Sequence, residues 1–166
     1  MQLLRVEQGG AITLETTARR AGLTKAGLMY HFPTKQQMMC AVVNHVADRW
    51  EVAMLAALDM QFEEATVADR IRAYVDVACS GEADRADYAV FSDAAYLPVL
   101  SARWNERFQR WLELPPDSAP AQRVRLTVAR LAADGFWTAD ATGLFAPSGD
   151  DRDAVVAFIT DLIGVT

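Results

Sequence analysis

Apolar residues recur at helical spacing along most of this 166-residue chain, and no run of alternating β-branched residues of the kind that marks a strand is present. Residue types that favour helices fill the segments between Gly, Pro and capping Thr or Asp residues. The pattern predicts an all-α protein. We expect one helix ending at Gly9-Gly10 and further helices over about 14–21, 25–31, 35–58, 66–80, 86–96, 98–114, 120–138 and 151–163.

Two of these helices are short and follow each other closely near the start of the chain. Thr13 can cap the first and Gly22 can end it in the left-handed conformation. Thr24 can cap the second, which must be short because Pro33 disfavours helix at the residue before it. A Thr-x-x-Gln capping box at Thr34 then starts a long helix. Two short helices joined by a turn of about three residues predict a helix-turn-helix, whose second helix lies in the DNA major groove.

The second short helix has two different faces. Leu28 and Phe32 lie four residues apart and are expected to pack inward together with Leu23. Small side chains on the other face would let the backbone approach base edges, and Lys25 supplies the main cation. The residues expected on this outer face are Thr24, Lys25, Ala26, Gly27, Tyr30 and His31.

Charge divides the chain at about the same point. Residues 1–47 contain five Lys or Arg and two Glu, whereas the remainder contains 11 basic and 20 acidic residues, so net charges of +3 and −9 give the total of −6. A basic head on an acidic body suggests an anion-binding module joined to a second module. We therefore expect a DNA-binding domain over 1–47 and an effector-binding and dimerisation domain over 48–166. The start lacks a signal-peptide pattern and no stretch is apolar enough to span a membrane, so we expect a cytoplasmic protein.

The residues from Thr13 to Lys35 resemble the tetracycline-repressor (TetR, AcrR-like) family of bacterial regulators. The resemblance covers about residues 3–47 and is carried by Gly22-Leu23-Thr24-Lys25-Ala26-Gly27-Leu28 and by Tyr30-His31-Phe32-Pro33-Thr34-Lys35. It implies an all-helical homodimer with an N-terminal DNA-reading head and a divergent C-terminal body that holds an effector pocket. It also implies DNA contacts for particular residues: Lys25, Ala26 and Gly27 in the groove, Tyr30, His31 and Lys35 as backbone-contacting or supporting residues, and Thr13 near a phosphate.

The sequence departs from the family pattern in two places. Met29 stands where many members have a Tyr that bonds a phosphate, and only Met1 to Gln8 precede Gly9-Gly10, where members usually carry a longer first helix. The C-terminal resemblance is weaker and rests on Leu131-Ala132-Ala133-Asp134-Gly135-Phe136-Trp137 and Gly143-Leu144. It implies that the last two long helices form a four-helix bundle with those of a partner. Apolar residues in these two helices fit that expectation: Val124, Val128, Leu131, Val155, Val156, Phe158, Ile159, Leu162 and Ile163.

Aromatic residues are unusually frequent in the acidic body. Core packing is the ordinary role of aromatics at helical spacing, yet a mostly apolar cavity with a few polar groups is how helical bundles hold small molecules. The candidates for lining such a cavity are Tyr74, Tyr88, Phe91, Trp104, Phe108 and Trp137.

Enzymatic activity has little support in the sequence. The chain has two histidines, both in the head, and lacks His-Glu-x-x-His, Gly-x-Ser-x-Gly and glycine-rich phosphate-binding motifs. We expect no metal and no cofactor. The expected function is a homodimeric repressor that binds a near-palindromic double-stranded DNA operator and is released by a small apolar or aromatic effector. One alternative is a regulator that binds DNA without a small-molecule effector, or one that activates. The other is a protein whose head binds DNA weakly or not at all and which acts as a small-molecule-binding or protein-interaction module.

Overall fold

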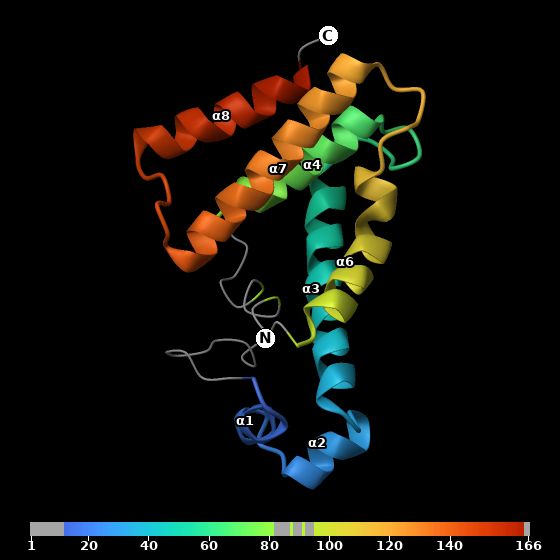
Figure 1. The fold of residues 1–166 in the computed structure, drawn as a ribbon, viewed down its shortest axis with the longest axis vertical. Helices are drawn as coiled ribbons and strands as arrows, with labels where there is room; N and C mark the ends of the chain where they lie inside the picture. Colours follow the sequence, from blue (N-terminus) through green and yellow to red (C-terminus); the bar gives the residue numbers. More distant parts are fainter. Residues whose placement is uncertain (1–11, 82–86, 88–90, 92–94, 165–166) are drawn as a thin grey trace. The chain divides into compact units, whose positions relative to one another are not determined.

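The computed structural model describes residues 12–81, 87, 91 and 95–164, and these residues form seven α-helices and no strand (Figure 1). The all-α prediction is therefore confirmed. The predicted helix ending at Gly9-Gly10 and most of the one over 86–96 lie outside the described residues. The helices are α1 (Leu14–Arg20), α2 (Lys25–His31), α3 (Lys35–Ala57), α4 (Val67–Cys79), α6 (Leu97–Leu112), α7 (Pro120–Thr142) and α8 (Asp150–Gly164).

The predicted helix starts near the beginning of the chain are confirmed by their capping bonds. The Thr13 hydroxyl accepts from the backbone N–H of Thr16 at 3.1 Å, and the Thr16 hydroxyl accepts from the N–H of Thr13 at 3.0 Å. Thr24 caps α2 by accepting from the N–H of Gly27 at 3.0 Å. Thr34 accepts from the backbone N–H three residues later at 3.2 Å at the start of α3. Each bond satisfies a backbone donor that the helix itself cannot satisfy.

One helix end differs clearly from the sequence-based expectation. α7 continues past the predicted end at Thr138 to Thr142 and stops before Gly143, which has a φ of +74°. The hydroxyls of Thr138 and Thr142 donate to the carbonyls four residues before them at 2.8 and 2.7 Å. These threonines satisfy their polar groups inside the helix, so they do not end it.

The chain packs as two compact units. The first unit comprises residues 1–47 and 85–106, and the second comprises residues 48–84 and 107–166. α3 and α6 contribute residues to both units. The assignment of DNA binding to residues 1–47 and of effector binding to residues 48–166 remains a prediction. The buried core of the first unit consists of Ala18, Leu28, Met38, Met39, Val43 and Leu100.

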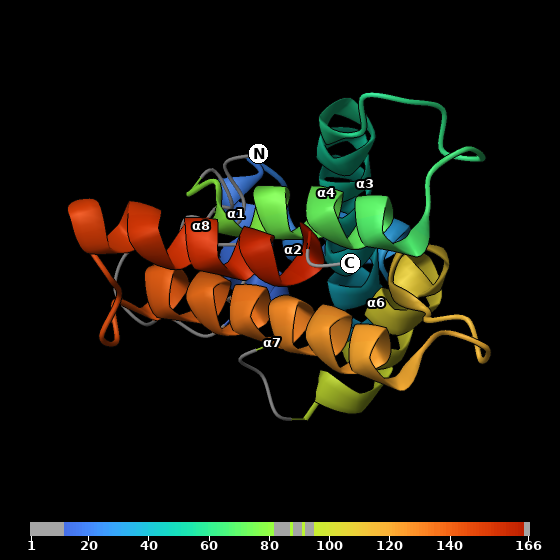
Figure 2. The same cartoon turned by 90° about the horizontal axis from the view of Figure 1, so that it is seen from above.

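In the second unit α4, α7 and α8 pack against one another (Figures 1 and 2). Ile71 of α4 and Ala133 of α7 are buried in this group of helices, as are Ile159 and Ile163 of α8. The expectation that Ile159 and Ile163 face a partner is therefore wrong. Their neighbour Phe158 is 67% exposed, because successive residues of a helix point in directions about 100° apart.

Arg152 ties the three helices of this group together. Its guanidinium donates to the Asp140 carboxylate of α7 at 2.8 Å and to the Cys79 carbonyl of α4 at 3.0 Å. It also lies over the ring of Phe136, 4.6 Å from the centroid. One side chain of α8 thus contacts both helices against which α8 packs.

Candidate nucleic-acid interface

α1 and α2 form a compact pair of short helices joined by a tight turn. Gly22 adopts a φ of +68°, which favours glycine because it has no Cβ. Just after it, the backbone N–H of Leu23 donates to the carbonyl of Ala18 at 2.9 Å. Ala18 and Leu28 are 1% and 4% exposed where the two helices pack. The helix-turn-helix expected from the sequence is present.

One of the three residues expected to pack inward does not do so. Leu28 is buried and Phe32 is half-buried against the core of the first unit, as their four-residue spacing predicts. Leu23 is instead 45% exposed, so the prediction for it is wrong. Leu23 belongs to the turn and not to a helix, and helical spacing therefore gave no guide to where its side chain lies.

The outer face of α2 presents polar and small side chains. Lys25, Ala26, Tyr30 and His31 are all exposed, and Tyr30 reaches 85%. The rings of Tyr30 and His31 meet edge to face, with centroids 5.3 Å apart. The two rings therefore lie together at the C-terminal end of α2, and Tyr30, two positions after the buried Leu28, points away from it.

Gly27 has a structural role that the sequence analysis did not identify. A Cβ at this position would lie 3.2 Å from the Thr24 hydroxyl, which is tighter than most Cβ contacts. That hydroxyl is the acceptor that caps α2. The absence of a side chain at position 27 therefore leaves room for the Thr24 hydroxyl that caps α2. It also means that no side chain projects from the helix surface at this position.

Lys25 has an intramolecular partner. Its ammonium donates to the carboxylate of Glu15 in α1, and both side chains are largely exposed. Glu15 was not among the candidate residues, because a separation of ten positions across a turn follows no helical spacing. The main cation of the outer face is thus paired with an acid on the neighbouring helix.

Two other predicted DNA contacts have structural partners within the first unit. Thr13 is half-buried and forms the capping box of α1. Lys35 is half-buried, and its ammonium lies 5.0 Å from the centroid of the Tyr96 ring, which attracts a cation through the face of the ring. Their contacts with DNA remain predictions.

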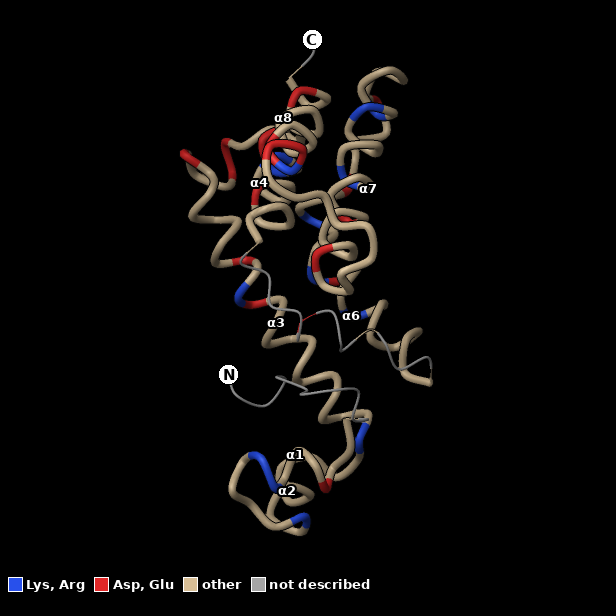
Figure 3. The backbone as a smooth tube through the Cα atoms, turned by 90° about the vertical axis from the view of Figure 1, so that its left-hand side faces the viewer, with Lys and Arg blue, Asp and Glu red and all other residues tan. Residues whose placement is uncertain are grey.

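Acidic residues are scarce on and beside these short helices, where the charged positions are mostly basic (Figure 3). Within residues 12–47 the charged side chains are those of Arg19, Arg20, Lys25 and Lys35, with Glu15 as the single acid. Most acidic residues lie from Asp48 onward. The surface around α1 and α2 therefore suits an anionic ligand better than the rest of the chain does.

The six candidate residues for effector binding do not form a single group. Tyr74, Phe108 and Trp137 are buried in the second unit around Trp50, whose ring centroid lies 5.5, 6.4 and 4.9 Å from theirs. Trp50 was missed because it falls in the apolar pattern of a long helix, which predicts core packing. The other candidates are Phe91 and Trp104, which contact each other in the first unit with centroids 5.3 Å apart, and Tyr88, which lies outside the described residues.

A part-buried polar contact lies beside the aromatic group of the second unit and joins the buried Tyr74 to the half-buried Asp134. The Tyr74 hydroxyl donates to Asp134 Oδ1 at 2.6 Å, and Arg130 pairs with Asp134 Oδ2 at 2.5 Å. Burial raises the pKa of Tyr74 well above its ordinary value, and the charge of Asp134 and its hydrogen bond raise it further. The phenol therefore remains a hydrogen-bond donor throughout the physiological pH range.

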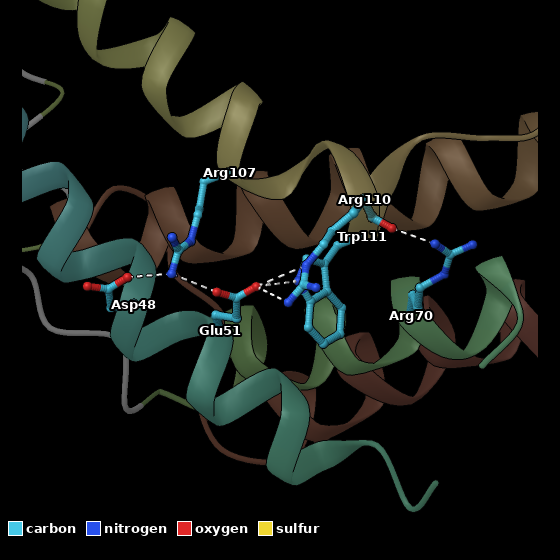
Figure 4. A network of polar contacts seen from close by, with 6 residues as sticks. All are labelled: Asp48, Glu51, Arg70, Arg107, Arg110 and Trp111. Carbon is cyan, nitrogen blue, oxygen red and sulfur yellow. Dashed lines mark hydrogen bonds and ion pairs between the residues drawn. The ribbon is translucent and has the colours of Figure 1, made fainter. Parts of the chain in front are cut away.

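Glu51 of α3 is the centre of an ion-pair network in the second unit (Figure 4). Its carboxylate pairs with Arg107 Nη2 at 2.7 Å and with Arg110 Nη2 at 2.5 Å, and it accepts from Trp111 Nε1 at 3.3 Å. Arg107 also pairs with Asp48. These contacts join α3 to α6.

The environment of Glu51 keeps it ionised. Burial favours the neutral acid, but hydrogen bonds from Arg110 and Trp111 and the charges of Arg110 and Arg107 outweigh burial, so the pKa lies below its ordinary value of 4.5. The network is thus a charged one at neutral pH.

Two kinds of feature are absent from the described residues. Among them no three His, Cys, Asp or Glu side chains are placed to hold a metal ion. None of the helices within the described ranges is both long and apolar enough to cross a membrane.

Comparison with protein families matches residues 68–164 to the description "tetracyclin repressor-like, C-terminal domain". The match runs from the first turn of α4 to the end of α8, more than half of the chain. It complements the motif resemblance, which lies in residues 3–47. No curated protein matches the chain. With the helix-turn-helix of α1 and α2 at one end and this matched domain at the other, the chain belongs to the TetR family of transcriptional regulators.

Proposed function

We propose that the protein is a DNA-binding transcriptional repressor that inserts α2 into the major groove of its operator. The observation that carries this proposal is the exposed outer face of α2, opposite Leu28, in a helix-turn-helix of a TetR-family chain. Helices in such motifs read base edges with residues near their N-terminus. Lys25, Ala26 and Gly27 occupy those positions in α2.

Each exposed residue has a definite part in this proposal. Lys25 donates to a phosphate or to guanine, whose O6 and N7 accept from Lys or Arg in the major groove. Ala26 lets the helix approach closely. Tyr30 and His31 donate to the phosphate backbone from the other end of α2, and Thr13 and Lys35 contact it from the starts of α1 and α3.

The experiment is a mobility shift with DNA from upstream of the protein's own coding sequence. Lys25→Ala should weaken binding by about 1–3 kcal/mol and leave the melting temperature nearly unchanged, since the side chain is exposed. Arg103→Ala, which removes an exposed cation from α6, is the matched control. Equal binding by Lys25→Ala and the wild-type protein would show that α2 does not contact DNA as proposed.

A homodimer would bring two copies of α2 to the two halves of a near-palindromic site. Val124, Val128 and Leu131 recur at spacings of four and three on α7 and are 62%, 45% and 54% exposed. Val155 and Phe158 of α8 are 39% and 67% exposed. These apolar side chains support a face that a second copy covers, because stable homodimer interfaces resemble a core cut in half.

Sedimentation velocity tests the dimer. Phe158→Asp should shift the protein toward monomer, because a charge would be buried where an aromatic ring packs. Phe145→Asp is the matched control, since Phe145 is fully exposed in the loop between α7 and α8. A monomeric wild-type protein at micromolar concentration would refute the proposal.

We further propose that an apolar or aromatic small molecule releases the protein from DNA by binding in the second unit. The group formed by Trp50, Tyr74, Phe108 and Trp137 supports this, because it combines tilted and edge-to-face rings with the part-buried hydrogen bond from Tyr74 to Asp134. The rings already touch one another, so a ligand among them must part them. Such a ligand acts only as far as it favours a conformation with weaker DNA affinity.

The effector proposal is tested with a panel of aromatic and aliphatic metabolites. Each compound that raises the melting temperature is then assayed for release of the upstream DNA fragment. Stabilisation without release would favour the alternative function, a small-molecule-binding or protein-interaction module with a weak or inactive head. Failure of the wild-type protein to bind any DNA would also favour this alternative function.

A further inference from the structure

The ion pair between Glu15 and Lys25 joins the two helices of the proposed DNA interface. Glu15 is the second residue of α1, and Lys25 is the first residue of α2. Lys25 Nζ donates to Glu15 Oε1, and the two side chains are 51% and 64% exposed for Lys25 and Glu15. α2 contains no other Lys or Arg. The helix assigned to the groove therefore has one fixed cation, and a carboxylate holds it.

The pair is not needed to hold the two helices together. Ala18 and Leu28 bury the contact between them, and the N–H of Leu23 bonds the carbonyl of Ala18 across the turn. Exposed ion pairs contribute little to stability, because water screens the charges and the side chains lose freedom. The main consequence of the ion pair is therefore that it alters how strongly Lys25 can bind a charged ligand.

A DNA phosphate requires the same ammonium group. The hydrogen bond from Lys25 and its positive charge hold the pKa of Glu15 below its ordinary value, so the carboxylate is ionised at neutral pH. An ammonium has three donors, and a phosphate could approach it beside the carboxylate. Two anions on one ammonium repel each other, however, so Glu15 opposes the phosphate whether it stays or is displaced.

We propose that Glu15 competes with the DNA backbone for Lys25 and so limits the affinity of the protein for DNA. This inference rests on the proposed function. In the protein without DNA the carboxylate neutralises the ammonium of Lys25. On DNA a phosphate replaces it, and Glu15 is left facing a polyanion.

A different role for Glu15, in which it positions Lys25 for DNA, predicts the opposite change in DNA affinity when its charge is removed. A carboxylate that merely held Lys25 in its DNA-binding orientation would favour binding, and its removal would weaken the complex. Competition predicts that removal tightens the complex. Whether a Glu15 substitution raises or lowers the affinity for DNA therefore separates the two roles.

The experiment compares wild-type protein with Glu15→Gln, which keeps the side-chain shape and removes the charge. Binding is measured by fluorescence anisotropy with two labelled duplexes, one from upstream of the protein's own coding sequence and one of unrelated sequence. We expect Glu15→Gln to bind about two- to five-fold more tightly at low salt, the range of an exposed ion pair. The dependence of log K on log salt should steepen by up to about one, because the interface gains one uncompensated cation.

Two further variants make the test specific. Glu63→Gln changes the net charge equally but lies in the turn after α3, and it should leave binding nearly unchanged. In a Lys25→Ala background Glu15→Gln should give a clearly smaller gain, because no ammonium remains to be released. Circular dichroism and melting curves of each variant establish that the helices remain folded.

The possible failures are distinguishable. Unchanged or weaker binding by Glu15→Gln overturns the competition, as does an equal gain with and without Lys25, or an equal gain from Glu63→Gln. In each of these cases the proposed function stands. If neither wild-type protein nor Glu15→Gln binds either duplex, the inference and the proposed function both fail.

Discussion

Removal of the Glu51 carboxylate should destabilise the protein measurably, although the arginines that it pairs with are about half exposed. Glu51→Ala removes one acceptor from each of Arg107, Arg110 and Trp111, and of these Arg107 keeps Asp48 as a partner. The arginine side chains are 45% and 52% exposed and can return to water. Trp111 is 0% exposed, so its indole N–H cannot.

The expected cost therefore comes chiefly from the indole. A buried donor left unsatisfied costs about 1–3 kcal/mol. For a chain of this size each kcal/mol corresponds to about 2–4 °C, so the melting temperature should fall by about 2–12 °C. Asp48→Ala is the control, since Asp48 is 58% exposed and Arg107 keeps Glu51 as a partner. We expect that control to change stability by no more than about 0.5 kcal/mol.

The same contribution should depend on pH in a defined direction. The pKa of Glu51 is lower in the folded protein than its ordinary value of 4.5. The contribution of the ionised carboxylate to the free energy of unfolding is therefore fully present above pH 4.5, and it is lost as the pH falls through the pKa of the folded protein. The free energy of unfolding in urea is measured for wild-type protein and for Glu51→Ala at one protein concentration. The wild-type value should exceed that of the variant by a constant amount near neutral pH, and the excess should shrink below pH 4.5. A variant as stable as the wild-type protein at pH 7, or a difference independent of pH, would refute this reasoning.

Two other substitutions test local features of the structure. Gly22→Ala should destabilise the protein by about 1–2 kcal/mol, because an L-residue at a φ of +68° brings its Cβ close to the backbone, and thermal unfolding measures this. Cys79 should react slowly with iodoacetamide, because burial raises the pKa of its thiol to about 11 and leaves about one thiolate in a thousand at pH 8. In a Cys40→Ser variant, labelling should be slow when folded and rapid in urea; rapid labelling of the folded variant would contradict the burial of Cys79.

Helix starts were predictable because they depend on residues within one turn of each other. Thr13, Thr24 and Thr34 each cap the helix that the sequence assigned to them. The end of α7 was not predictable in the same way. Thr138 disfavours helix on average, but here its hydroxyl bonds the carbonyl four residues earlier, and the helix continues.

The ion pairs between different helices could not be read from the sequence. Glu15 and Lys25 are ten positions apart, and Glu51 and Arg110 are 59 apart. Neither spacing follows a helical or strand period, so the pairs exist only because packing brings their helices together. The proposed DNA contact of Lys25 was predictable from its place in a motif, whereas its ion pair with Glu15 was not.

The aromatic residues show the same limit and change how the effector proposal is best tested. The sequence chose candidates by residue type, which does not separate core packing from a binding site. The structure places Trp104 against Phe91 in the first unit, whereas Trp50 contacts both Tyr74 and Trp137 in the second. A substitution at Trp104 therefore reports on a different group of rings from the one beside the buried hydroxyl of Tyr74. Trp50→Phe, which keeps an aromatic ring of smaller size, is the variant that should alter an effector's affinity if the second unit holds the site.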